Sequence, residues 1–231
     1  MTASSAAQSK PTNDKDHSPT DFTLSPELLD FTISPAEFLA SRPDIHNIIA
    51  GAIVFRTIPG VPPSQCNPEI LLLQRAASDS FPLKWEIPAG TADPKLDSSI
   101  AAVAVRELWE ETHLRASRLR KAVPMGLPDG VTNLTCVGEV EDARMDSQLP
   151  MCLLRLGDQT WAVVSFLVDL EDEGKAGEVI LQDDEHVQYT WVSANEVEIG
   201  MSGRTGENLD FVSEAMKMVL LEGFRMIKEA L

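Results

Sequence analysis

Runs of apolar residues along the chain predict a series of strands interrupted by helices. Short apolar segments bounded by proline, glycine and polar residues indicate buried strands. Strands are predicted at 47–56, 69–75, 85–88, 119–123, 161–170 and 187–192. The region 126–150 is weakly patterned and is predicted to be a hairpin or loop insertion, of the kind that carries substrate specificity.

Apolar stripes and capping residues predict three helices. At about 35–41, a serine precedes Pro35 and Glu37 completes a capping box, which favours a helix start over a phosphorylated Ser-Pro site. The terminal helix is predicted at about 207–230, with a stripe that favours core packing over a partner groove: Phe211, Ala215, Met218, Val219 and Met226. A middle helix carries an apolar stripe at Ala101, Val105, Leu108 and Thr112. Its start can be capped by Asp97, Ser98 or Ser99.

This order of elements predicts an α/β fold, in which helices pack on both faces of a mixed sheet. Residues 1–20 are polar and are predicted to be a disordered tail. Residues 21–46 are predicted to form an N-terminal extension with a short helix, and residues 47–231 to form the main domain, including the C-terminal helix.

The polar face of the middle helix is the most informative chemical feature. Glu107, Glu110 and Glu111 stand at positions i, i+3 and i+4, so their side chains fan out over one face. Carboxylates this close repel each other, and a bound cation would relieve that repulsion. Oxygen ligands suit Mg²⁺ or Mn²⁺. The alternative is a solvated acidic face on an ordinary surface helix.

The stretch from Gly90 to Leu114 resembles the signature of the Nudix hydrolases. Gly90 is followed by Arg106, Glu107, Leu108, Glu110, Glu111 and Leu114. The flanking segments Leu71–Arg75 and Trp85–Pro88 resemble the strands that lead into that signature. The resemblance implies a Nudix-type α/β/α sandwich with a mixed β-sheet.

Two positions depart from the family pattern. Ser98 stands where the family has its first glutamate, and the neighbouring Asp97 could reach the same metal site or could cap the helix. His113 replaces the glycine that ends the helix. We interpret His113 as a left-handed C-cap substitute and not as a ligand, because histidine tolerates that conformation better than most residues.

The resemblance also implies the chemistry: hydrolysis of the diphosphate linkage in a nucleoside diphosphate derivative, with Mg²⁺ or Mn²⁺ as cofactor. Glu107 is then a ligand or the base, and Arg106 orients it. Glu110 and Glu111 are the main metal ligands, and the carbonyl of Gly90 completes the shell. Asp97 is a further candidate ligand.

Other candidates lie outside the signature. Glu185 follows Asp183 and Asp184 at a place where some family members use an acidic ligand or base, although an acidic loop before a strand has the same pattern. Trp85 and Trp161 could stack a nucleobase, but each fits a buried core tryptophan better.

Charge limits the partners. Over 231 residues, 36 acidic and 19 basic side chains give a net charge of −17. This balance argues against extended contact with nucleic-acid polymers or anionic membranes, but not against a small phosphate substrate held through Mg²⁺. Three cysteines without metal spacing and the lack of an N-terminal apolar run predict a cytoplasmic protein. The oligomeric state stays open, a homodimer included.

Two non-catalytic alternatives remain open at this stage. A Nudix-fold protein could bind a nucleotide or a partner without turnover. The missing first glutamate favours this alternative, as does the loop from Gly90 to Ser98, which is two residues longer than the family's. An acidic interaction scaffold without a ligand would require the glutamate face to be a coincidence.

Overall fold

The computed structural model describes residues 21–56, 67–136, 140–172, 178–181 and 184–230. The predicted tail at 1–20 lies outside the described residues, as does Asp183. The strands are β1 Thr23–Leu24, β2 Asn47–Arg56, β3 Glu69–Arg75, β4 Trp85–Glu86, β5 Ala89–Thr91, β6 Ala116–Val123, β7 Asn133–Thr135, β8 Asp142–Met145, β9 Cys152–Leu156, β10 Gln159–Leu170 and β11 His186–Val192. The helices are η2 Pro26–Thr32, α1 Pro35–Ser41, α2 Ile100–Thr112, α3 Ala194–Ile199 and α4 Glu214–Ala230. In the part of the chain described here, no helix has both the length and the apolarity to cross a membrane.

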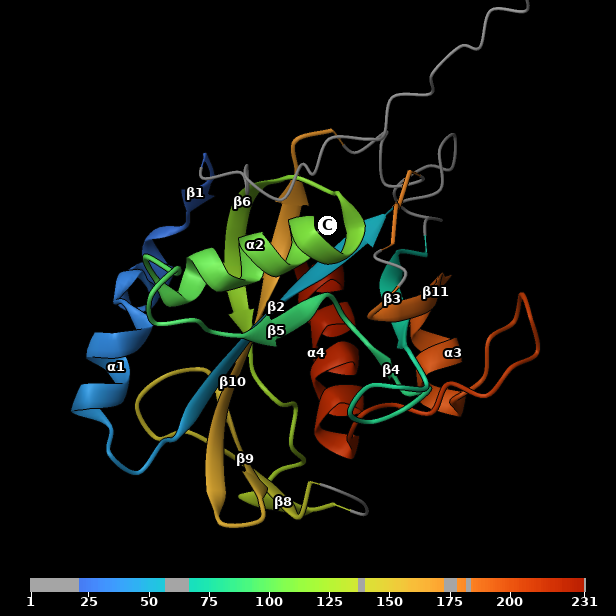
Figure 1. Ribbon diagram of the computed structural model, residues 1–231. Helices are drawn as coiled ribbons and strands as arrows, with labels where there is room; N and C mark the ends of the chain where they lie inside the picture. The colour runs from blue at the N-terminus through green and yellow to red at the C-terminus, as the bar shows by residue number, and fades with distance from the viewer. Residues whose placement is uncertain (1–20, 57–66, 137–139, 173–177, 182–183, 231) are drawn as a thin grey trace, which may run out of the picture.

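All the strands join in one mixed sheet (Figure 1). Its main path runs β11-β3-β2-β10-β9-β8-β7. The central pair β2 and β10 is parallel, with Asn47 opposite Trp161 and Val54 opposite Val168. The pairs β2–β3, β3–β11 and β9–β10 are antiparallel.

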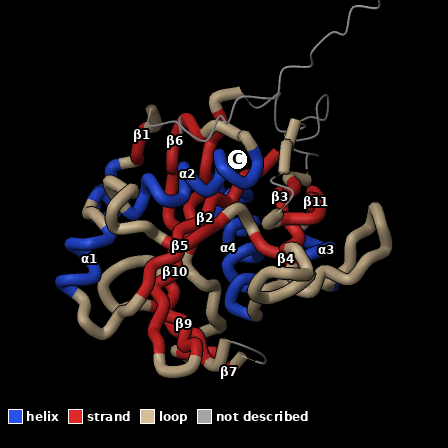
Figure 2. The backbone as a smooth tube through the Cα atoms, viewed as in Figure 1, coloured by secondary structure: helices blue, strands red, loops and turns tan. Residues whose placement is uncertain are grey.

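Helices cover both faces of this sheet (Figures 1 and 2). Helix α2 packs across β2 on one face, where Ala50, Ala52 and Val54 share a core with its apolar side chains. Helix α4 packs on the other face, where Ile53 belongs to a second core that contains Phe224. The alternation of side chains along a buried strand supplies both cores. The α/β/α sandwich expected from the sequence is confirmed.

The N-terminal segment packs against the α2 side of the sheet. Helix α1 has the predicted bounds, and Ser34 and Glu37 form both bonds of its capping box. The segment before it, which also begins with a serine followed by a proline (Ser25 and Pro26), forms the 3₁₀ helix η2. Phe31 is fully buried and meets Phe166 of β10 edge to face, with ring centroids 5.1 Å apart. The segment 21–41 therefore shares the core of the domain.

Two predicted boundaries were wrong. The strand expected at 85–88 is divided, because β4 ends at Glu86 and pairs with β3, whereas β5 begins at Ala89 and pairs with β2. The terminal helix starts at Glu214 and not at 207. Before it, Phe211 forms a bridge to Trp85, and Ser213 accepts a hydrogen bond from the Met216 N–H at 3.1 Å, as a helix cap does.

The weakly patterned region is the predicted hairpin. Strands β7 and β8 pair antiparallel, with Leu134 opposite Ala143, and β8 then pairs with β9. This extension lengthens the sheet beyond β10 and brings Val140 and Cys152 to the cavity described below.

Candidate active site

Helix α2, which carries the three glutamates, is capped at both ends. The Ser99 hydroxyl accepts a hydrogen bond from the Ala102 N–H at 3.1 Å, so Ser99, not Asp97 or Ser98, is the N-cap. At the other end His113 has φ 58° and ψ 17°, and its N–H donates to the Trp109 carbonyl. The interpretation of His113 as a left-handed C-cap is confirmed.

The three glutamates of α2 differ in environment. Glu107 and Glu111 are buried and line a cavity, whereas the Glu110 side chain is 39% exposed and does not line it. Glu111 Oε2 accepts a hydrogen bond from the Ala89 N–H at 3.0 Å. A Cβ at Gly90 would lie 2.2 Å from the Glu107 carboxylate, so only glycine allows this carboxylate to rest against β5.

Burial disfavours the ionised form of two of these carboxylates. Desolvation raises the pKa of Glu107 to about 7, against the opposing effect of Arg106. Desolvation, followed by the charges of Glu86 and Glu107, raises the pKa of Glu111 well above its usual range. A divalent cation would favour the ionised forms that the protein alone penalises.

Arg106 pairs with several carboxylates along one side of helix α2. Its guanidinium donates to both oxygens of Asp97, at 2.9 and 3.0 Å, and to Glu110 at 2.8 Å, and it forms an ion pair with Glu107 at 2.7 Å. Asp97 is buried, and it also accepts the Asp93 N–H at 2.7 Å. Both oxygens of Asp97 are thus occupied by protein donors, and the structure places Asp97 as the partner of Arg106.

A second group of polar residues faces α2 from the sheet. Strand pairing places His186 opposite Arg75, and Glu86 opposite Leu73, so three strands bring these side chains together. His186 Nε2 lies 3.2 Å from Glu86 Oε1 and 4.0 Å from Glu111 Oε1. Arg75 donates to the same Glu86 oxygen at 2.5 Å.

These residues fit a divalent cation. Glu111, Glu185 and His186 each offer one ligand atom, and the three atoms lie within 4.8 Å of one another. Glu185 is exposed and its carbonyl accepts the Ala76 N–H at 2.8 Å, which ties the end of β11 to β3. The sequence indicated Glu185, but it gave no role to Glu86 or His186. The only feature of the sequence that pointed to Glu86 and His186 was the presence of a polar residue inside an apolar strand segment.

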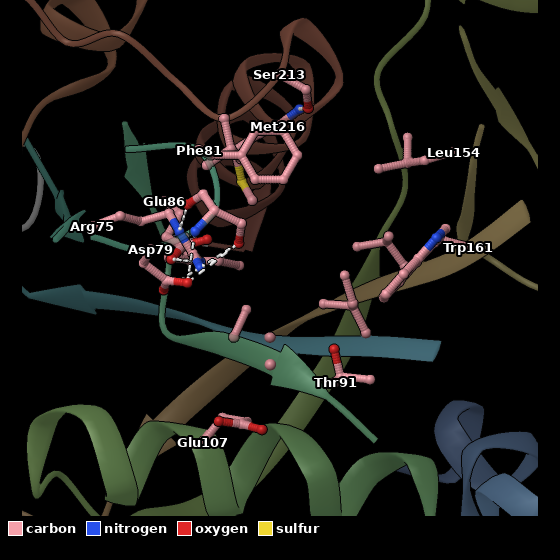
Figure 3. Close-up of a pocket in the computed structure, with 18 of the residues that line it drawn as sticks. Arg75, Asp79, Phe81, Glu86, Thr91, Glu107, Leu154, Trp161, Ser213 and Met216 are labelled. Carbon is pink, nitrogen blue, oxygen red and sulfur yellow. Dashed lines mark hydrogen bonds and ion pairs between the residues drawn. The ribbon is translucent and has the colours of Figure 1, made fainter. Parts of the chain in front are cut away.

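The cluster lies at one end of a cavity of about 560 Å³. We define the acidic end by Glu86, Glu107, Glu111, Glu185 and His186. We define the apolar end by Leu154 and Leu156 of β9 together with Trp161 and Val163 of β10. In Figure 3, Arg75, Asp79 and Glu86 lie on one side of the cavity and Leu154 and Trp161 on the other.

The two candidate tryptophans differ. Trp85 is 2% exposed and belongs to the core, as its pattern indicated. Trp161 is half-buried and lines the cavity beside Leu154, its paired residue on β9, so the core interpretation was wrong for this residue. Its indole N–H has no partner among the residues described.

A family model described as NUDIX domain matches residues 59–210. No curated protein matches the chain. A solved Nudix hydrolase from M. smegmatis, RenU, is 16% identical with a TM-score of 0.42, over 79% of this chain and 83% of that one.

Two further solved structures come from Shewanella oneidensis NrtR. Its NUDIX domain complexed with ADP ribose is 16% identical with a TM-score of 0.45, over 85% of this chain and 99% of that one. NrtR complexed with a 27mer DNA is 15% identical with a TM-score of 0.40, over 80% and 64%. Identities this low, with TM-scores below 0.5, assign no function to this chain.

Proposed function

Because the chain belongs to the Nudix family, we propose that it is a hydrolase that uses Mg²⁺ or Mn²⁺ to cleave the diphosphate linkage of a nucleoside diphosphate derivative. The observation that carries the proposal is the acidic end of the cavity, where two buried carboxylates of α2 meet Glu86, Glu185 and His186. Such a concentration of unfavourable charge is typical of a functional site.

Each residue has a role in this proposal. Glu107 and Glu111 would hold the metal together with the Gly90 carbonyl, and Arg106 fixes the orientation of Glu107. Glu110, which the resemblance also makes a ligand, pairs with Arg106 outside the cavity. Asp97 positions Arg106. When bound, divalent cations neutralise the phosphate oxygens and acidify water.

Glu185 offers one carboxylate oxygen to the metal, and with the other it is the proton acceptor. It is exposed at the mouth of the cluster, where a water molecule can reach it. A water oxygen attacks one phosphorus, its proton passes to the carboxylate, and the bond from that phosphorus to the bridging oxygen breaks. The bridging oxygen leaves with the second phosphate.

The lining of the cavity supports a metal-dependent reaction. Among the described lining residues the only Lys or Arg is Arg75, and its guanidinium already pairs with Glu86 and Asp79. A diphosphate therefore finds no free Lys or Arg among the described residues of this end, and metal ions would balance its charge. The apolar end accommodates the nucleobase.

The other expectations are part of the same proposal. A net charge of −17 disfavours a nucleic-acid polymer as partner. The DNA complex of NrtR means that the fold by itself does not exclude one. We also propose a cytoplasmic protein without membrane contact, and its buried free thiols, Cys136 and Cys152, are compatible with that location.

A substrate panel tests the proposal. Purified protein is incubated with ADP-ribose, nucleotide sugars, dinucleoside polyphosphates, coenzyme A and oxidised nucleotides, with Mg²⁺, with Mn²⁺ and with EDTA. We expect two phosphate-containing products from at least one compound, with turnover abolished by EDTA. Binding of a compound by calorimetry without any product in either metal would support the alternative, a Nudix-fold binding protein without turnover.

A further inference from the structure

His186 is an unusual member of the acidic end. Its side chain is almost fully buried, at 3% exposure for the residue, and it stands at the first position of β11. One ring nitrogen, Nε2, faces Glu86 at 3.2 Å and Glu111 at 4.0 Å. The other, Nδ1, has no hydrogen-bond partner among the described residues.

Neither neutral tautomer satisfies the ring. If Nε2 carries the hydrogen, it donates to Glu86, and the Nδ1 lone pair is buried without a donor. If Nδ1 carries the hydrogen, that N–H is buried without an acceptor, and the Nε2 lone pair faces carboxylate oxygens. Either way a nitrogen lone pair lacks a favourable partner within the protein, and buried polar groups rarely remain so.

A metal ion at this place would be a partner for the Nε2 lone pair, with the ring hydrogen on Nδ1. The ligand atoms of Glu111, Glu185 and His186 lie within 4.8 Å of one another. Two ligands at about 2.1 Å from one ion are separated by at most about 4.2 Å, so the three groups need only a small contraction to bind it.

We infer that His186 is a nitrogen ligand of the metal centre and that it makes this centre prefer a first-row transition ion such as Mn²⁺ over Mg²⁺. The inference rests on the proposed function, because it concerns the same metal centre. Mg²⁺ favours an all-oxygen, octahedral and partly hydrated environment. An imidazole replaces one of those oxygens with a softer donor, which favours first-row transition ions.

Pulsed electron paramagnetic resonance of bound Mn²⁺ tests the inference without altering the fold. The wild-type protein is prepared with natural histidine and with ¹⁵N-labelled histidine. We expect nitrogen modulation of the Mn²⁺ signal, and we expect it to change from the ¹⁴N to the ¹⁵N pattern on labelling. Mn²⁺ bound without a histidine nitrogen signal would overturn the inference while leaving the metal-dependent hydrolase in place.

Two variants locate the signal and the selectivity. His186→Gln retains a hydrogen-bonding side chain near Glu86, and His46→Gln is the control at an exposed histidine outside the cavity. We expect His186→Gln to lose the nitrogen signal and to lower the ratio of Mn²⁺ to Mg²⁺ affinity about tenfold. His46→Gln should change neither.

The outcomes distinguish the two proposals. If calorimetry finds no binding of either ion at millimolar concentration, the metal centre itself is wrong and the proposed function fails. If both ions bind equally in the wild type and in His186→Gln, only the nitrogen ligand is wrong. Glu86→Gln completes the set. If His186 merely positions Glu86, neither the wild type nor any of these variants should give a nitrogen signal.

Discussion

The two ends of the cavity are built by opposite physical means. At the acidic end, carboxylates from α2, β4 and the start of β11 are held a few ångströms apart, and burial raises the pKa of Glu107 and Glu111. At the apolar end, β9 and β10 contribute Leu154 and Trp161 from opposite positions of one strand pair. The first arrangement is electrostatically unfavourable in the metal-free protein, and the second is favourable through burial of apolar surface.

This difference assigns different tasks to the two ends. A cluster that the fold alone penalises is retained for a ligand that relieves the penalty, and a cation does so for carboxylates. An apolar wall with an aromatic side chain recognises shape and π surface, and it supplies little to bond cleavage. We therefore expect substitutions at the acidic end to lower kcat and those at the apolar end to raise KM.

The largest effect is expected from Glu111→Gln. The amide is a far poorer ligand for a hard cation, so activity should fall at least about a thousandfold. The metal-free variant should nevertheless melt at a higher temperature than the metal-free wild type, by a few degrees. Activity with the best substrate and melting curves in EDTA measure both effects.

The pH dependence of this stabilisation has a defined sign. Because the folded state raises the pKa of Glu111 above its usual value of 4.5, the folded protein holds this proton more tightly than the unfolded chain. Raising the pH from 5 to 8 therefore destabilises the metal-free wild type. The advantage of Glu111→Gln should grow over that range, whereas Glu198→Gln, on the exposed surface of α3, should show none. A metal-free Glu111→Gln protein that melts below the wild type would contradict the account of the acidic end.

The next effect is expected from Trp161→Ala. Stacking of a base on an aromatic ring contributes about 1–3 kcal/mol, so KM should rise by roughly 5- to 150-fold, with kcat changing much less. Trp161→Phe should lie between the wild type and the alanine variant. Steady-state kinetics measures both constants, and Mn²⁺ titration should show unchanged metal affinity. A loss of kcat at constant KM would remove the division of tasks between the two ends.

The sequence predicts the acidic end better than the apolar end, because the helix residues of the acidic end are close neighbours in the sequence. Glu107 and Glu111 share a helix face, so their spacing alone brings them together. The pairing of Glu86 with His186 joins residues 100 positions apart, and it depends on the register of β3 with both β4 and β11. Local patterns do not encode register.

The same limit explains the errors at Trp161 and α4. The strand containing Trp161 was predicted, but the cavity beside it is also lined by residues of β9 and α4, which are other elements of the chain, α4 being distant from it in the sequence. The start of α4 was misplaced because the apolar stripe continues upstream to Phe211, where pairing with Trp85 holds the chain in an extended bridge. Tertiary contact overrode periodicity at that point.

The smallest effect on catalysis is expected from Asp97→Asn. In the structure Asp97 lies beside the acidic end and not within it, because both of its oxygens accept from Arg106 and one also accepts from the Asp93 N–H. The amide keeps one acceptor but places an NH₂ group against the guanidinium. A charge-assisted pair of this kind contributes about 1.5–3 kcal/mol, so the melting temperature should fall by several degrees.

Metal binding separates this positioning role from a ligand role. If Asp97 acts through Arg106, Mn²⁺ affinity should stay within about threefold of the wild type while stability falls. Ser99→Ala serves as the matched control, because it removes the actual N-cap of α2, at about 1 kcal/mol, and leaves the Arg106 pairs intact. A tenfold loss of metal affinity at unchanged melting temperature would instead place Asp97 within the metal centre. The acidic end would then extend around the side of α2, and Asp97 would have replaced the carboxylate that is missing at Ser98.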